Sequence, residues 1–240
     1  MSRVAALVTA ALIAAGTLTA CSTSSADRPI TVAASSSLQA VMATIATQFE
    51  QEHPGTTVRI AESNARNVDV IATDTESAMD RLGKQVISPR RFASNSLIII
   101  APLGNPKHIT GFASLGNPDL RVATCSERLP CGASVVRTEH VTGTQLGTPL
   151  HVDSGATAVA YVAAGRADAA LAYRTQARSG NGVSFMTVDD PVFDQAINRY
   201  PIAVVRGSKN DSTAADFIAT VLGPEGGRAL ATAGFGPPSG

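Results

Sequence analysis

The sequence predicts an α/β fold in which mostly parallel sheets are flanked by helices. Segments with the residue patterns of strands and of helices alternate along most of the chain, as they do where helices cover a parallel sheet. The segment NSLIIIAP, residues 95–102, is almost continuously apolar, which is typical of a strand buried on both faces. Hydrophobic residues make up 44% of the 240 residues, so the chain can bury a large core.

Each expected element has a local pattern that supports it. The strand candidates are short apolar runs at residues 29–35, 54–61, 68–73, 95–102, 120–125, 167–173 and 199–205. The first helix is expected to bury apolar residues that recur at helical spacing, namely Leu38, Val41, Ile45 and Phe49. Further helices are expected at residues 75–82, 157–165 and 212–223, the last two closed by Gly165 and by Gly223–Pro224.

The first 20 residues are interpreted as an export signal and not as part of the fold. Arg3 gives a positive start, and the apolar residues 4–16 form a stretch too short to span a membrane comfortably. The signal ends in LTAC, residues 18–21, which resembles a bacterial lipoprotein signal that is cut before its cysteine. We therefore expect a lipid on Cys21, a tether over residues 21–27, and a soluble domain held at the outer face of the cell membrane. An ordinary signal peptide with an incidental cysteine is the alternative.

Two further cysteines, Cys125 and Cys131, remain for the exported domain. Export brings them to an oxidising compartment, where a remaining pair is usually bridged, so we expect a disulfide worth ~2 kcal/mol. A metal site is the weaker alternative, because the four histidines are scattered without the spacing of ligands. A redox pair would more often have the spacing C-x-x-C.

Charge and motifs exclude several functions. The 19 basic and 19 acidic residues cancel, which argues against a nucleic-acid partner. Neither G-x-S-x-G nor H-E-x-x-H occurs, and the dipeptide Glu139–His140 is isolated. We therefore expect no enzyme, no cofactor and no metal held by protein side chains, with an exported hydrolase as a remote alternative.

Three consecutive serines, residues 35–37, lie where the first strand ends and the first helix begins. Serine is a common helix cap, because its side chain accepts a hydrogen bond from a free amide of the first turn. A helix start is also a ready anion site, where serine hydroxyls add donors without adding a full charge. The two interpretations are compatible, and we favour anion binding.

Several segments in a fixed order resemble the periplasmic molybdate-binding proteins, which are the substrate receptors of ATP-driven importers. The segments include AASSSLQAVMATIATQFEQEHPG, DVIATDTESAMDRL, RFASNSLIIIAPLGNP, LPCGAS, TAVAYVAAGRADAALAYRTQA, YPIAVVRGSKN and GPEGGRALATAGF. The resemblance implies a two-lobed, periplasmic-binding-protein-like fold of type II with a ligand cleft between the lobes. It places residues 28–102 and 201–240 in the first lobe and residues 103–200 in the second, with crossovers near 101–102 and 200–201.

The same resemblance implies a receptor, expected to be a monomer, that delivers molybdate or tungstate to an ABC permease and its ATPase. Matching the family's motifs residue by residue implies that the anion contacts five residues: Ser37, Ser63, Cys131, Gly155 and Tyr173. Serine and tyrosine would contribute hydroxyls, whereas Cys131 and Gly155 would contribute backbone N–H groups. The ordinary alternatives are a helix cap at Ser37, a loop glycine at Gly155 and a packing tyrosine at Tyr173.

One segment departs from the family. Between the expected strands at 54–61 and 68–73 only residues 62–67 remain, too few for the helix that usually follows the family's second serine cluster. We expect these strands to pair antiparallel, or one to lie outside the sheet, or the lobe to have lost part of its edge. Ser63 would then lack a supporting helix, and Glu62 beside it would repel an anion. The shortened segment predicts impaired affinity or, as an alternative, an adaptor lipoprotein that keeps the fold without binding a ligand.

Overall fold

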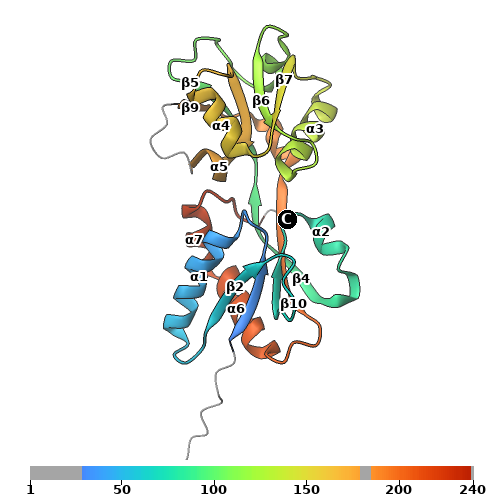
Figure 1. The fold of residues 1–240 in the computed structure, drawn as a ribbon, viewed down its shortest axis with the longest axis vertical. Helices are drawn as coiled ribbons and strands as arrows, with labels where there is room; N and C mark the ends of the chain where they lie inside the picture. The colour runs from blue at the N-terminus through green and yellow to red at the C-terminus, as the bar shows by residue number, and fades with distance from the viewer. Residues whose placement is uncertain (1–28, 179–184, 239–240) are drawn as a thin grey trace, which may run out of the picture.

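Two five-stranded sheets form the two lobes of the protein (Figure 1). This computed structural model describes residues 29–178 and 185–238. The expected signal, the tether and Cys21 lie outside the described residues. The predicted two-lobed α/β fold is confirmed.

The first sheet has the strand order β2-β1-β3-β10-β4. Its strands are β1 (Ile30–Ala34), β2 (Val58–Glu62), β3 (Val70–Ala72), β4 (Val86–Asn95) and β10 (Asn198–Val205). The hydrophobic core on one face includes residues of α1 (Gln39–Glu52), α6 (Asp211–Leu222) and α7 (Pro224–Thr232). A smaller cluster on the other face includes Met79 of α2 (Glu76–Asp80).

The second sheet has the strand order β7-β6-β8-β5-β9. Its strands are β5 (Leu97–Pro102), β6 (Arg121–Cys125), β7 (Thr148–Val152), β8 (Ala169–Tyr173) and β9 (Phe185–Val188). One core cluster packs against α3 (Pro130–Thr142), and another packs against α4 (Gly155–Ala163) and α5 (Arg174–Arg178). Short 3₁₀ helices span Gly83–Gln85, Phe112–Gly116 and Pro191–Ala196.

The strand directions bring the carboxyl ends of the parallel strands of both lobes to the lobe boundary. In each sheet three adjacent strands are parallel, and the reversed strand, β10 or β5, pairs antiparallel with its two neighbours. The chain passes from the carboxyl end of β4 through Ser96 into the start of β5, so both of these ends lie at the boundary. Consequently β1–β3 and β6–β8 all end there, which is where ligands of α/β proteins usually bind.

The crossovers lie earlier in the chain than the sequence suggested. Residues 97–102 pair with β8 and β9, so they belong to the second lobe and not to the first. Asn198 already pairs with Asn95 in the first sheet, so residues 198–200 belong to the first lobe. Only Ser96 separates β4 from β5, and so short a break leaves no polar or glycine-rich signal in the sequence.

The short connection between β2 and β3 carries no helix, as its length predicted, but both strands pair parallel to β1. The expected antiparallel pairing and the expected loss of a strand are therefore wrong. A parallel connection of seven residues, 63–69, suffices because β3 has only three residues and starts level with Val32, whereas β2 ends level with Ala34. The connection therefore has to return along β1 by a distance of only about two residues before β3 begins.

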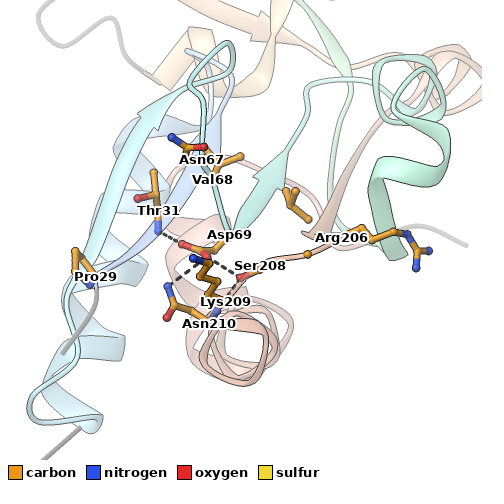
Figure 2. Close-up of a pocket in the computed structure, with 11 residues that line it drawn as sticks. Pro29, Thr31, Asn67, Val68, Asp69, Arg206, Ser208, Lys209 and Asn210 are labelled. Atoms are coloured by element: carbon orange, nitrogen blue, oxygen red, sulfur yellow. Dashed lines mark hydrogen bonds between the residues drawn. The ribbon is translucent and has the colours of Figure 1, made fainter. Parts of the chain in front are cut away.

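Asp69 anchors this connection at the far end of the first lobe. Its carboxylate accepts hydrogen bonds from the Thr31 amide at 2.8 Å, the Ser208 hydroxyl at 2.6 Å and the Asn210 side chain at 3.3 Å (Figure 2). These bonds tie β1, the connection and the loop after β10 together. Asp69 is 8% exposed, so the bonds form largely away from water.

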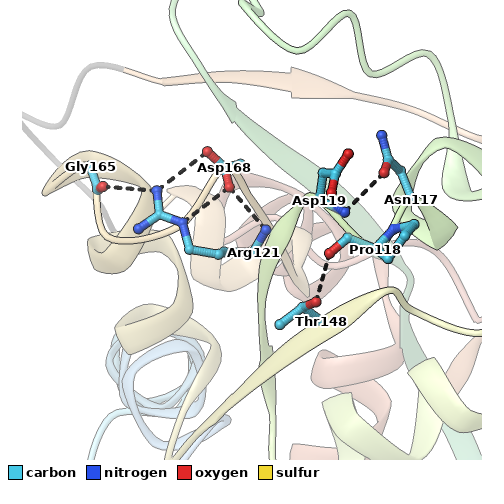
Figure 3. A network of polar contacts seen from close by, with 7 residues as sticks. All are labelled: Asn117, Pro118, Asp119, Arg121, Thr148, Gly165 and Asp168. Atoms are coloured by element: carbon cyan, nitrogen blue, oxygen red, sulfur yellow. Dashed lines mark hydrogen bonds and ion pairs between the residues drawn. The ribbon is translucent and has the colours of Figure 1, made fainter.

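A second polar network fixes the parallel strands of the other lobe (Figure 3). The carboxylate of Asp168, which precedes β8, accepts hydrogen bonds from the Arg121 amide at 2.9 Å and from its guanidinium at 3.2 and 3.3 Å. The guanidinium also donates to the Gly165 carbonyl at 3.4 Å. The hydrogen bonds from Arg121 hold the pKa of the Asp168 carboxyl below its ordinary value.

Most elements that the sequence predicted are present, but α3 was not predicted as a helix. Cysteine, glycine and five valine or threonine residues lower its helix propensity. Its signals are at the ends: Pro130 occupies the first turn, and Gly143 adopts a left-handed conformation at φ 71° just after the last residue. Among the described residues, no helix combines the length and apolar character that a membrane crossing needs.

Candidate functional site

In the serine run at the start of α1, the hydroxyls of Ser36 and Ser37 are available to bind a ligand. The helix is capped by Leu38, whose side chain forms no capping hydrogen bond and is fully buried. Ser36 and Ser37 are exposed, and no hydrogen bond joins either hydroxyl to the described residues. The first-turn amides of α1 also lack a side-chain cap. This arrangement favours a set of free donors over the capping alternative.

Ser35 shapes this end of the first lobe. Its amide donates to the Ala72 carbonyl at 3.3 Å, and its own carbonyl accepts from the Leu38 amide at 2.8 Å. The turn between β1 and α1 is thereby fixed to the end of β3. The Ser35 hydroxyl oxygen is buried without a partner among the described residues. A ligand that brought a hydrogen-bond donor or acceptor to this turn would give the Ser35 hydroxyl a partner.

Ser63 lies in an exposed turn directly after β2. The turn closes through the Ala65 amide, which donates to the Glu62 carbonyl at 2.9 Å. Since β1 and β2 are neighbours, Ser63 and Ser37 follow adjacent strand ends of the same lobe. Ser63 has no helix behind it, and Glu62 is exposed beside it.

Cys131 lies in the first turn of α3, and a disulfide joins it to Cys125 at the end of β6 with a Cα–Cα distance of 5.8 Å. Cys131 is 4% exposed, so its side chain faces the core. Its backbone amide belongs to the first turn of the helix, where amides have no partner within the helix. The disulfide therefore holds a helix start against the end of a strand.

Tyr173, the last residue of β8, binds the start of the same helix. Its hydroxyl donates to the Pro130 carbonyl at 2.7 Å and lies 2.9 Å from the Ser134 hydroxyl. The Ser134 hydroxyl in turn accepts from the Arg137 guanidinium at 2.6 Å. Burial raises the pKa of the Tyr173 hydroxyl far above its ordinary value, so the group is neutral at physiological pH. With its hydrogen on Pro130, the hydroxyl positions α3 and is not free to donate elsewhere.

Gly155 begins α4 and is buried. The N-cap is Ser154, whose hydroxyl accepts from the Thr157 amide at 3.0 Å. No hydrogen bond within the described residues uses the amides of Gly155 and Ala156. The helix therefore starts with two free backbone donors at the lobe boundary.

Gln176 packs directly against Gly155, and sequence reasoning missed it. A side chain at position 155 would collide with the Gln176 carboxamide, which explains why glycine fits there. The carboxamide oxygen of Gln176 accepts from the Tyr173 amide at 3.0 Å. Only the close approach to Gly155 in three dimensions reveals this residue, because its position in α5 carries no recognisable motif.

The structure thus brings the three expected second-lobe residues together and leaves the two first-lobe serines on the facing edge. Tyr173 connects the starts of α3 and α4, through its hydroxyl to Pro130 and through its amide to Gln176. All of these donors are uncharged. Within the described residues, no group of three or more His, Cys, Asp or Glu residues could hold a metal ion.

A cavity of about 600 Å³ lies elsewhere, at the opposite end of the first lobe (Figure 2). Thr31, near the start of β1, and Val205, at the end of the reversed strand β10, line it. Both ends lie away from the lobe boundary. Its lining mixes the Asp69 carboxylate with Arg206 and Lys209, and none of the five expected site residues lines it.

Comparison with known proteins identifies the family. The sequence model of the bacterial extracellular solute-binding protein family matches residues 30–236. The chain belongs to this family. The molybdate-binding protein ModA of Mycobacterium tuberculosis is 32% identical to this solute-binding protein over 252 residues, with 98% of this chain and 96% of that protein covered. The ModA protein of Mycobacterium bovis matches equally well, and the expected family resemblance is confirmed.

Solved structures share the fold of this solute-binding protein. A substrate-binding domain assigned to a molybdenum ABC transporter of Clostridium difficile has a TM-score of 0.75 at 16% identity, covering 88% of this chain and 99% of its own. The periplasmic molybdate-binding protein of Azotobacter vinelandii has a TM-score of 0.66 at 15% identity, covering 88% and 100%. The sulfate-binding protein SubI of Mycobacterium tuberculosis has a TM-score of 0.66 at 19% identity, covering 87% and 86%. At these identities the likeness concerns the fold alone.

Proposed function

We propose that this solute-binding protein is an extracytoplasmic receptor for molybdate, or for the similar anion tungstate, that delivers its ligand to an ABC importer. The observation that carries the proposal is the 32% identity to mycobacterial molybdate-binding proteins over 98% of the chain. The family of extracellular solute-binding proteins and the two-lobed fold agree with it. Binding and release, without catalysis, are the activity proposed.

The chemistry of the lobe boundary suits a small divalent oxyanion. An anion that leaves water must exchange its hydration shell for hydrogen-bond donors, because unpaired burial of a charge is costly. The first turns of α1, α3 and α4 supply backbone amides together with the positive ends of helix dipoles. The proposed contacts are the hydroxyl and amide of Ser37, the hydroxyl of Ser63, and the amides of Cys131 and Gly155. Tyr173 holds the start of α3 in place and would contact the anion only after releasing Pro130.

The shortened connection after β2 would limit the affinity. Ser63 contributes a hydroxyl from an exposed turn, and the exposed Glu62 carboxylate lies next to it. Loss of two donors to a charged ligand would cost about 3 kcal/mol, or roughly a hundredfold in affinity. We therefore propose weaker binding than a complete serine cluster would give.

The proposed partners follow from the same function. The closed form of the receptor would dock as a monomer on a permease that an ATPase drives. A lipid on Cys21 would tether the domain to the outer face of the cell membrane, with residues 21–27 as the spacer. Neither the family nor its relatives lend support to a hydrolase.

Isothermal titration calorimetry of the soluble domain with molybdate, tungstate and sulfate tests the proposal. We expect saturable 1:1 binding of molybdate or tungstate, and about a tenfold weaker Kd for Ser37→Ala, which removes one donor to a charged ligand. Ser212→Ala is the matched control, because Ser212 is exposed on α6 and its hydroxyl forms no hydrogen bond within the described residues. Absence of binding to all three anions would contradict the receptor function and favour an adaptor without a ligand.

A further inference from the structure

The carboxamide of Gln176 has a fixed orientation. A backbone N–H can only donate, so the atom that faces the Tyr173 amide at 3.0 Å is the oxygen of the carboxamide. The nitrogen therefore points in the other direction. Because Tyr173 ends β8 and its hydroxyl is held by Pro130, the anchor of Gln176 is itself rigid.

The nitrogen of this carboxamide lies at the start of α4. Nε2 is 3.0 Å from the position that a Cβ atom of residue 155 would occupy, and the oxygen lies closer still. In a helix the Cα–Cβ bond tilts toward the amino terminus, so a group at that position lies on the side of the first turn. Gln176 thus places an N–H donor close to the first turn of α4, whose Gly155 and Ala156 amides are unpaired within the described residues.

Nε2 of Gln176 has no hydrogen-bond partner among the described residues, and Gln176 is only partly exposed. An oriented amide at a helix start is a prepared donor when no other group of the described residues competes for its hydrogens. It differs from a lysine or arginine because it adds no net charge.

We propose that Nε2 of Gln176 donates a hydrogen bond to the bound oxyanion and acts as a further binding residue of the second lobe. The inference rests on the proposed receptor function and names one more contact in that site. A side-chain donor from the second lobe would partly replace what the first lobe lost with its second serine cluster.

Two substitutions test the donor, of which Gln176→Glu keeps the anchor to the Tyr173 amide and Gln176→Met removes anchor and donor together. Gln176→Glu keeps an oxygen for the Tyr173 amide but replaces the donating nitrogen by a carboxylate oxygen. Gln176→Met removes the donor without adding a charge. In calorimetric titrations with molybdate we expect the Kd to rise about a hundredfold or more for Gln176→Glu and about tenfold for Gln176→Met.

Gln195→Glu is the matched control for the added charge. Gln195 is exposed in the second lobe and forms no hydrogen bond within the described residues. It should bind molybdate within about twofold of the unsubstituted protein. The melting temperatures of all ligand-free variants are measured in parallel, and for Gln176→Glu we expect no large change because its anchor is kept.

The outcomes distinguish this inference from the receptor function. If the unsubstituted protein binds molybdate and either Gln176 variant binds within about threefold of it, Gln176 is no donor and the inference is wrong, while the receptor function stands. If the unsubstituted protein binds no oxyanion, the receptor function fails and the inference fails with it.

Discussion

At the scale of single residues, we expect the ion pair between Arg121 and Asp168 to contribute more to the free energy of unfolding than an ordinary surface pair does. The Asp168 side chain is 15% exposed and accepts three hydrogen bonds from Arg121, one of them from the backbone. We predict that Asp168→Asn lowers the free energy of unfolding by about 1–2 kcal/mol at neutral pH, because the half-exposed guanidinium loses its charged partner. Urea denaturation measures this. Asp119→Asn changes the charge equally on an exposed turn and should change little.

The same pair makes stability depend on pH. The pKa of Asp168 is lowered in the folded state, so its contribution is present above the pKa of about 3.9 of an unfolded aspartate. The contribution is lost as the pH falls through the lower folded-state pKa. The stability gap between the unsubstituted protein and Asp168→Asn should therefore shrink in strongly acidic solution. A gap that stayed constant from pH 7 to acid would contradict the assigned pKa shift.

Tyr173 tests whether a buried hydroxyl positions the start of α3. Tyr173→Phe leaves the Pro130 carbonyl without its donor, so we predict a loss of about 1–2 kcal/mol in unfolding free energy and several-fold weaker anion binding. Tyr161→Phe is the matched control, because within the described residues the Tyr161 hydroxyl forms its one hydrogen bond with the Arg166 guanidinium, at 3.1 Å and exposed. Equal effects of the two substitutions on binding would show that α3 needs no such support.

At the scale of elements, the disulfide clamps the loop between β6 and α3. Cross-linking two cysteines six positions apart removes loop entropy from the unfolded chain, worth about 2 kcal/mol. We predict that replacing both Cys125 and Cys131 by alanine lowers the unfolding free energy by this amount and weakens binding through the Cys131 amide. Reducing the unsubstituted protein should produce the same shift, and the reductant should leave the double variant unchanged. A reductant effect on the double variant would point to another cause.

Elements with strong local patterns were predictable, and those set by tertiary contacts were not. The helical spacing of Val41, Ile45 and Phe49 predicted their burial in α1. The continuous apolar run of β5 predicted a strand that is buried on both faces. By contrast, β7 is mostly exposed and contains a proline, so pairing with β6 defines it more than its sequence does. The parallel pairing of β2 and β3 also depended on a register that the sequence does not show.

At the scale of the whole molecule, the proposed site depends on two lobes, which two strand crossings connect in the described part of the chain. The family's motifs predict which residues donate to the anion, and the calorimetric titrations test those assignments. The sequence could not predict that the Tyr173 hydroxyl donates its hydrogen bond to the Pro130 carbonyl, nor that Gln176 lies against Gly155. Both contacts depend on packing between segments that are distant in the sequence. The sequence also placed the crossovers too late, since Ser96 alone marks the first of them.

Because the lobes are joined by the β4–β5 connection and the start of β10, we expect the molecule to close as two rigid bodies around Ser96 and Ile197. Donors on both edges would reach one anion only after closure, and ligand binding would favour the closed form by its difference in affinity for the two forms. We predict that saturating molybdate lowers the radius of gyration of the soluble domain in small-angle X-ray scattering toward the roughly 17 Å expected for a compact chain of that domain's length. Ser37→Ala should need about tenfold more molybdate for the same compaction. Calorimetric binding without any change in the radius of gyration would mean that one lobe binds the anion alone, and closure would then play no part in capture.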